Sequence, residues 1–302
     1  MARLRLALLA LLCAFAVASC AVPPGRMDGG LTLSDPVARA DVAACCRSSE
    51  RFPDWMVEIA EANIDLTRRV GLIQLRRGHL GRSAEGRAVV EGVLQPLDIL
   101  LVHSEGRMSG HLIPGQFTHG AIYIGTEAQL RAAGLWSLPA LRPYHTQIRA
   151  GQIYLEAVDG GVRLAPADVV LNTDATVILR ADLTSAEARA TLARGLARMG
   201  IPFDMRFDVS TADALFCAEL INAMYPRLNL PISMVYDTPT IIPDVIVAGA
   251  LLGEVPLSLV GYVEAVGGGS VRALSANGLA ARIAAAWPPG GTTPAPYPDA
   301  LN

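Results

Sequence analysis

The sequence of 302 residues contains no lysine, so all 25 of its basic residues are arginine. This absence excludes a P-loop nucleotide site, a pyridoxal Schiff base and a serine–lysine dyad, because each of them needs a lysine amine. The chain also has no excess of positive charge, since its formal net charge is -3, and nucleic-acid binding is therefore not expected. Hydrophobic residues make up 52% and charged residues 18% of the chain, which is typical of a globular protein and not of a disordered one.

A long hydrophobic run capable of spanning a membrane is also missing. Arg3 and Arg5 precede an apolar run at residues 6–17, which is shorter than the ~20 residues that a membrane-spanning helix needs. A short apolar run behind basic residues is typical of a signal peptide. The sequence therefore predicts a signal peptide over residues 1–19.

The residues that follow the apolar run predict a lipid anchor. The sequence Val-Ala-Ser-Cys at residues 17–20 resembles a bacterial lipobox, in which Cys20 is lipidated and becomes the first mature residue. An ordinary secretory cleavage site beside an incidental cysteine is the alternative. With the lipid present, Ala21 at the next position favours the periplasmic face of the outer membrane, and residues 20–40 are expected to form the tether.

Cysteine is scarce in the rest of the chain, where only Cys45, Cys46 and Cys217 remain. Three thiols cannot all pair within one chain, so at least one is expected to stay free in an oxidising compartment. A bond between Cys45 and Cys46 is not expected, because adjacent Cα atoms lie ~3.8 Å apart, closer than in ordinary disulfides. Cys217 is the cysteine that calls for an explanation.

Hydrophobic periodicity predicts a helical extension over residues 41–95. Apolar residues spaced by three and four indicate one amphipathic helix at residues 53–76, and a second short helix is expected at residues 83–93. A tail rich in Pro, Gly and Thr at residues 288–302 is expected to be unstructured. The main domain is expected between these parts, over residues 96–287.

Short β-type runs replace the helical periodicity from residue 97 onwards. They predict the strands of one mainly antiparallel sheet, and two later segments predict helices that pack on it. The expected fold class is therefore α+β. Strands are expected at residues 97–103, 118–124, 152–158, 176–180 and 259–264, and helices at residues 184–199 and 215–225.

Three side chains in these elements suit nucleophilic catalysis: His119 and Glu156 in two expected strands, and Cys217 near the start of an expected helix. A thiol nucleophile needs a base within hydrogen-bond reach and a third group that orients the base. If the two strands are neighbours, His119 and Glu156 form a cross-strand pair. A helix that begins just before Cys217 would favour its thiolate, whereas a capping box at residues 210–213 would place Cys217 in the second turn.

These residues also have structural alternatives. A cysteine in an apolar helix is often an inert core residue, a histidine at a strand start is often a structural one, and Glu156 can instead pair with Arg163. The acidic side chains of Asp98, Asp213 and Glu219 are expected to cap or support neighbouring groups.

Neither a metal site nor a cofactor is expected from the sequence. His103 and His111 lie close together in the chain, but no HExxH or CxxC spacing accompanies them.

Four short runs, in their order along the chain, resemble a known family. They are LDILL from residue 97, FTHGAI from residue 117, LEA from residue 155 and FCAEL from residue 216. This order is similar to that of the circularly permuted papain-like amidases of the YiiX/YaeF type, which are relatives of the NlpC-type cell-wall peptidases. In ordinary papain-like enzymes the cysteine precedes the histidine, whereas here it follows. The resemblance covers roughly residues 97–225.

The resemblance implies a circularly permuted papain-like (NlpC-type) fold, in which helices pack on an antiparallel sheet. It implies that Cys217 is the nucleophile, His119 the general base and acid, and Glu156 the third member of the triad. The implied reaction is acyl transfer to Cys217 followed by hydrolysis of the thioester. Two departures from the family pattern are Leu97, where a glycine is usual, and a long insert at residues 125–150, which would reshape or cover the cleft.

The implied substrate is an amide in a small molecule or in a peptidoglycan-derived peptide, and no cofactor is implied. One alternative keeps the same triad but acts on an acylated lipid, as a fatty-acyl hydrolase or acyltransferase. Another alternative is a non-catalytic binding lipoprotein that has kept the fold. Membrane contact is expected through the N-terminal lipid alone.

Overall fold

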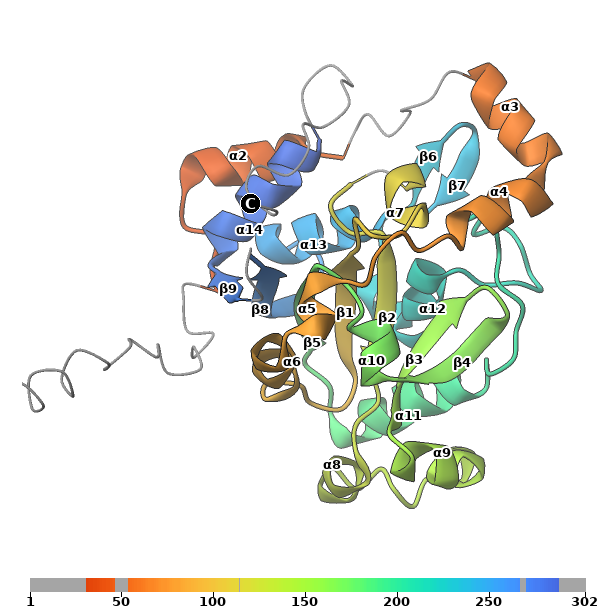
Figure 1. The fold of residues 1–302 in the computed structure, drawn as a ribbon. Helices are drawn as coiled ribbons and strands as arrows, with labels where there is room; N and C mark the ends of the chain where they lie inside the picture. The colour runs from red at the N-terminus through yellow and green to blue at the C-terminus, as the bar shows by residue number, and fades with distance from the viewer. Residues whose placement is uncertain (1–30, 47–53, 114, 267–269, 288–302) are drawn as a thin grey trace, which may run out of the picture.

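The computed structural model describes residues 31–46, 54–113, 115–266 and 270–287 of the chain. The expected signal peptide, the lipid on Cys20, the tail and the first part of the tether lie outside these ranges. The described residues form a mixed α+β fold around one large sheet, with helices before the first strand (Figure 1). This arrangement confirms the predicted fold class.

The central sheet has seven strands, and each of them pairs antiparallel with its neighbours. In their order across the sheet they are β4 (Gly161–Pro166), β3 (Gln152–Val158), β2 (His119–Tyr123), β1 (Asp98–His103), β5 (Ala175–Ala181), β8 (Leu257–Ala265) and β9 (Val271–Leu274). All five predicted strands are present, whereas the two edge strands β4 and β9 were not predicted. A separate hairpin pairs β6 (Ser233–Val235) with β7 (Thr238–Thr240).

Hydrophobic side chains fill both faces of the sheet, because successive residues of a strand point to opposite sides. Leu100 packs in one core with residues of α5 (His79–Arg82) and α6 (Ala84–Glu91). Leu101 packs in the other core with residues of α11 (Ser185–Leu196) and α12 (Cys217–Met224). The remaining helices of the main domain are α7 (Ser109–Leu112), α8 (Glu127–Ala132), η1 (Pro139–Tyr144), α9 (His145–Arg149), α10 (Ala167–Val170), η2 (Pro226–Leu228), α13 (Pro243–Leu252) and α14 (Ala276–Ala286).

The predicted single helix at residues 53–76 is wrong in its extent. The chain forms two shorter helices there, α3 (Asp54–Ala62) and α4 (Ile64–Gly71), which follow α2 (Pro36–Ala44). Asn63 separates them with a non-helical backbone, and both its side-chain amide and its backbone N–H donate to the carbonyl of Ile59. The side chains of Ile59 and Leu66 are exposed, so the apolar stripe of these helices is not buried in the core.

The expectation that Cys45 and Cys46 do not pair is also wrong. The two neighbouring cysteines form a disulfide just beyond the end of α2, and the backbone of Cys46 takes a φ of 67°. This local turn brings together two side chains that an extended chain would point apart. In the described part of the chain Cys217 is the free cysteine, in agreement with the odd number of thiols.

Leu97 occupies a position whose backbone favours glycine. Its φ is 74°, in the left-handed region that residues with a Cβ seldom adopt. Its backbone N–H donates to Tyr123 at 2.6 Å, its carbonyl accepts from the hydroxyl of Tyr225 at 2.7 Å, and its side chain is buried. Next to it, the buried carboxylate of Asp98 pairs with Arg180 at 2.6 Å. The left-handed φ gives a physical reason for the glycine that is usual at this position.

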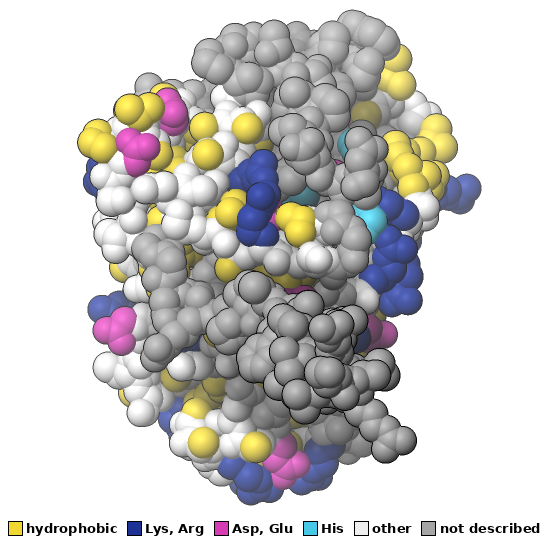
Figure 2. All heavy atoms as spheres, turned by 60° about the vertical axis from the view of Figure 1, so that its left-hand side comes forward, with side chains coloured by type: hydrophobic (Ala, Val, Ile, Leu, Met, Phe, Trp, Pro, Cys, Tyr) yellow, Lys and Arg dark blue, Asp and Glu magenta, His cyan; other side chains and the backbone are white. Residues whose placement is uncertain are grey.

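The surface mixes side chains of different kinds. On the face that carries α2 and α14, hydrophobic, basic and acidic side chains alternate among the described residues (Figure 2). In the ranges that the structure describes, helices are too short or too polar to cross a membrane.

Candidate active site

Cys217 is the first residue of α12. The preceding residue, Phe216, has the extended backbone of an N-cap, so the capping box considered at residues 210–213 does not begin this helix. The first helical hydrogen bond runs from the N–H of Leu220 to the carbonyl of Phe216 at 2.9 Å. The N–H groups of Cys217, Ala218 and Glu219 therefore lie in the unpaired first turn, where the helix dipole favours negative charge. The Cys217 side chain sits at this helix end and is buried.

His119 and Glu156 are brought together by the pairing of β2 with β3. Ala121 lies directly opposite Glu156, so His119, two residues earlier on the same face of β2, is its diagonal neighbour. The Nε2 atom of His119 lies 3.0 Å from Oε2 of Glu156. Because Nε2 is engaged by the carboxylate, Nδ1 is the ring nitrogen that remains for the thiol.

Arg163 supports the same carboxylate from the other side. It lies opposite Glu156 in the pairing of β3 with β4, and its guanidinium donates two hydrogen bonds to Oε1, at 3.0 and 2.9 Å. The pairing of Glu156 with Arg163 was considered as an alternative to its pairing with His119. The structure contains both pairs, because each oxygen of Glu156 serves one partner. Arg163 is half-exposed, whereas the side chain of Glu156 is only 3% exposed.

The charges of these groups stabilise one another. Burial alone would raise the pKa of Glu156, but the hydrogen bonds and charges of His119 and Arg163 lower it. Burial likewise lowers the pKa of His119, but the hydrogen bonds and charges of Cys217 and Glu156 outweigh it and raise this pKa to about 10. At neutral pH the imidazole is therefore protonated and lies between a carboxylate and a thiol.

Glu219 belongs to the same helix start as Cys217. Its carboxylate accepts a hydrogen bond from the backbone N–H of Phe216, which is the contact that a glutamate three residues after an N-cap makes in a capping box. Burial raises the pKa of Glu219 to about 7 against this hydrogen bond, and the charges of Asp204 and Asp208 add to the rise. The supporting role expected for Glu219 is in keeping with this contact.

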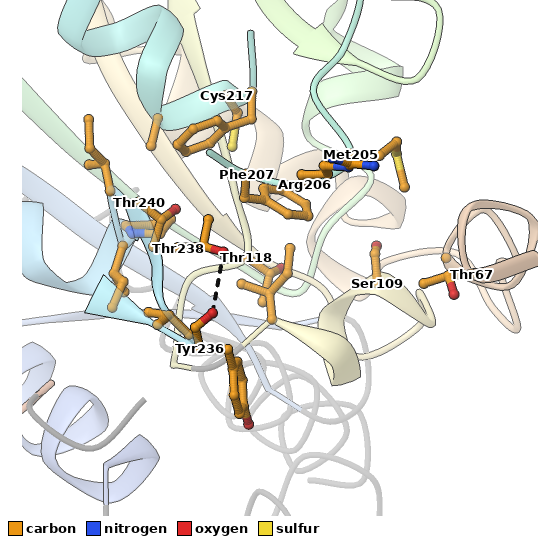
Figure 3. A pocket seen from close by; sticks show the side chains of 18 of the residues that line it. Thr67, Ser109, Thr118, Met205, Arg206, Phe207, Cys217, Tyr236, Thr238 and Thr240 are labelled. Carbon is orange, nitrogen blue, oxygen red and sulfur yellow. Dashed lines mark hydrogen bonds between the residues drawn. The ribbon is translucent and has the colours of Figure 1, made fainter. Parts of the chain in front are cut away.

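Two cavities meet at Cys217. One has a volume of about 280 Å³ and is lined mainly by apolar atoms, including those of Phe216 and Ile242. Figure 3 shows this apolar cavity, with Cys217 and Phe207 close to the β6–β7 hairpin. The other cavity, of about 300 Å³, contains His119 and the charged groups around it. Both volumes are near the lower end of the ~300–1,000 Å³ range of ligand pockets.

The insert at residues 125–150 does not cover either cavity. It folds into α8, η1 and α9, which lie at the lower end of the molecule in Figure 1, away from α4 and the β6–β7 hairpin at the upper end. Its own centre is Trp136, which stacks on His145, with two arginines over the indole ring. The residues that line the two cavities come from other parts of the chain, so the covering role considered for this insert is not seen in the described part of the chain.

Sequence reasoning missed several groups of the polar cavity. Arg68, Arg107 and Asp159 line it, but they come from segments with no catalytic pattern. Arg68 pairs with Asp159 at 2.7 Å, whereas the guanidinium of Arg107 has no acidic partner among the described residues. Arg163, by contrast, could be related to Glu156 from the sequence, because it follows Glu156 across a turn at residues 159–161.

Part of the chain matches the model of a known protein family. Residues 93–240 match the model of a family described as permuted papain-like amidase enzymes, YaeF/YiiX, C92 family. The matched segment contains His119, Glu156 and Cys217, and the match confirms the resemblance found in the four short runs. No curated protein and no solved structure matches the chain.

Proposed function

Because residues 93–240 make the chain a member of the permuted papain-like amidases, we propose that it is a cysteine hydrolase whose catalytic triad is Cys217, His119 and Glu156. The observation that carries this proposal is the position of Cys217 at the start of α12, beside an imidazole that Glu156 holds by a 3.0 Å hydrogen bond. A helix start and a neighbouring imidazolium both favour the thiolate form of a cysteine.

In the proposed reaction the Cys217 thiolate attacks the carbonyl carbon of an amide. The oxyanion that forms lies near the unpaired N–H groups of the first turn of α12, and the N–H of Cys217 is one of its donors. Protonated His119 gives its proton to the leaving nitrogen, the C–N bond breaks and an amine departs. A thioester remains on Cys217.

The second half of the reaction hydrolyses the thioester. Neutral His119 takes a proton from a water molecule, which attacks the thioester carbonyl, and the acid product leaves as the thiolate forms again. Glu156 keeps the ring oriented and stabilises its protonated form in both halves, and Arg163 donates to the other oxygen of Glu156.

Intact-mass spectrometry of the full chain tests this proposal. On mixing with para-nitrophenyl acetate, a minimal acyl donor, we expect one acetyl group to be added to Cys217 and then lost by hydrolysis. Cys217→Ala should take up no acetyl group. Equal acetylation and turnover by Cys217→Ala would contradict the proposal and favour a binding protein on this fold.

We also propose that the protein is anchored in the bacterial cell envelope through a lipid on Cys20, on the periplasmic face of the outer membrane. The support is in the sequence, where a short apolar run leads to Val-Ala-Ser-Cys and then Ala21. Metabolic labelling with an alkyne-tagged fatty acid should tag the wild-type protein and not a Cys20→Ala variant. Labelling of both proteins would contradict the anchor at this residue.

A further inference from the structure

The helical extension before the sheet carries large hydrophobic side chains that the core does not bury. They are Ile59 of α3, Leu66 of α4, and Ile73 and Leu75 just after α4, with exposures between 47% and 69%. We call these four residues the apolar patch. The helices α3 and α4 contact each other at the upper right of Figure 1. The patch precedes residues 93–240, so it lies outside the part of the chain that the family model describes.

The backbone fixes the last two side chains of the apolar patch to the main domain. The N–H of Leu75 donates to the carbonyl of Gly106 at 2.8 Å, and the carbonyl of Ile73 accepts from the N–H of Met108 at 3.0 Å. These hydrogen bonds tie the segment after α4 to the loop between β1 and α7. Because this backbone is held in place, the exposed side chains cannot turn into the core. An exposed apolar patch of this kind is typical of a docking surface.

Basic side chains border the apolar patch. Arg69 lies one helical turn after Leu66, and Arg77 follows Leu75 by two residues. Both arginines are exposed, and neither forms an ion pair with another residue that the structure describes. Residues 64–77 contain four arginines and one acidic residue. Exposed aliphatic side chains beside exposed arginines are suited to a surface of anionic lipid headgroups.

The proposed lipid on Cys20 would keep a membrane within reach of the apolar patch. The eleven residues from Cys20 to the first described residue, Leu31, span at most ~40 Å when extended. A surface that is tethered so closely meets the bilayer at a high effective concentration, so even a weak contact is populated. The helices of the described ranges are too short or too polar to cross a membrane, so this contact lies on the bilayer surface.

We propose that the apolar patch, together with Arg69 and Arg77, docks on the anionic lipid surface of the membrane that holds Cys20. Docking goes beyond the lipid anchor, because it sets the orientation of the domain and not only its distance from the bilayer. Gly71, at the end of α4, lines both cavities at Cys217, so docking holds the active site beside the membrane surface. The proposal uses the proposed anchor and does not depend on the chemistry of Cys217.

Quenching of tryptophan fluorescence by brominated lipids tests the docking surface. The full-length chain is mixed with an excess of vesicles of phosphatidylcholine and phosphatidylglycerol, whose acyl chains carry bromine. Ile73→Trp places a reporter in the apolar patch, and Val37→Trp places a matched reporter on α2, at a position that is 67% exposed. After subtraction of the wild-type signal, Ile73→Trp should be quenched and Val37→Trp should not, because an interfacial surface inserts its apolar side chains into the acyl boundary.

The contribution of charge is tested in the Ile73→Trp chain. Vesicles of phosphatidylcholine alone should quench this reporter less, and Arg69→Gln combined with Arg77→Gln should remove the dependence on lipid charge. Each arginine near an anionic surface favours binding by roughly fivefold, so loss of both should lower the ratio of docked to undocked protein by roughly 25-fold. Arg87→Gln combined with Arg142→Gln, on α6 and η1, removes the same charge elsewhere and is the matched control.

The outcomes decide between the membrane and other occupants of the apolar patch. Stronger quenching of Ile73→Trp than of Val37→Trp, reduced by loss of the two arginines, supports docking on the membrane. Equal quenching at the two positions would overturn it. Dimerisation in light scattering that Leu75→Ser removes would also overturn it, because the patch would then belong to a second copy of the chain. Fatty-acid labelling of Cys20 reports the anchor separately, so failure of the anchor and failure of docking are distinguishable.

Discussion

The two sides of Cys217 are built from different kinds of structure. On the polar side, His119, Glu156 and Arg163 project from three neighbouring strands, and the hydrogen-bond registers of the sheet set their spacing. On the apolar side, the cavity walls come from the loop before α12, from the β6–β7 hairpin and from the start of α13. The reacting groups therefore lie on rigid elements, whereas the walls of the apolar cavity lie largely on connecting segments, which tolerate sequence change more readily.

The largest loss of activity is expected from substitution of Cys217, which lies where the polar and apolar sides meet. Cys217→Ala should lower kcat/KM for amide hydrolysis by on the order of a thousandfold or more, because the covalent step is lost. Steady-state kinetics with thermal unfolding as a fold control measure this effect. Wild-type activity in a well-folded Cys217→Ala would show that neither side of the site has been assigned correctly.

On the polar side, His119→Gln should lower kcat/KM by roughly 10²- to 10⁴-fold, because proton transfer to the leaving group is lost. The pKa of His119 is raised from 6.5 to about 10, so the folded protein binds this proton more tightly than the unfolded chain does. The resulting stabilisation is fully present below pH 6.5 and is lost as the pH rises through about 10. Urea unfolding across this range should show a smaller pH dependence in His119→Gln than in the wild type.

A smaller effect is expected one strand further from the thiol. Glu156→Gln should lower kcat more than Arg163→Gln does, because Glu156 contacts the imidazole whereas Arg163 acts through Glu156. Arg163 is also 51% exposed, and ion pairs at exposed positions contribute little. Equal losses in the two variants would mean that the carboxylate depends on Arg163 for its position.

The smallest effect is expected at Glu219, on the helix that carries the thiol. Its pKa is raised from 4.5 to about 7, so its contribution to stability is fully present below pH 4.5 and is lost as the pH rises through about 7. Glu219→Gln keeps an acceptor for the Phe216 N–H and removes the charge, so unfolding of this variant should be less dependent on pH in that range. An unchanged pH dependence would mean that the pKa of Glu219 is the same in the folded protein and in the unfolded chain.

The polar side could be predicted from the sequence to a large extent. Alternating apolar runs predicted β2 and β3, and alternation placed His119 and Glu156 on faces that can meet. The sequence does not decide where the helix that contains Cys217 begins, because residues 210–213 also carry a capping pattern. The three-dimensional structure shows that the helix begins at Cys217.

The apolar side could not be predicted, because nothing local in the sequence brings its parts together. Residues 205–216, the hairpin β6–β7 and the start of α13 converge only through packing on the sheet. The same limit explains the two errors near the N-terminus. The non-helical backbone of Asn63 divides a periodic segment into two helices, and a turn after α2 allows Cys45 to bond to Cys46.

The account as a whole depends on an activated thiol at Cys217, and its rate of alkylation by iodoacetamide tests this most directly. In the wild-type protein the rate at neutral pH should be high, because the sulfur lies beside the protonated His119 and at the start of α12. In His119→Ala the rate at neutral pH should fall and then rise with pH like that of an ordinary thiol, and Cys217→Ala should take up no label. Identical pH profiles in the wild type and His119→Ala would contradict the account.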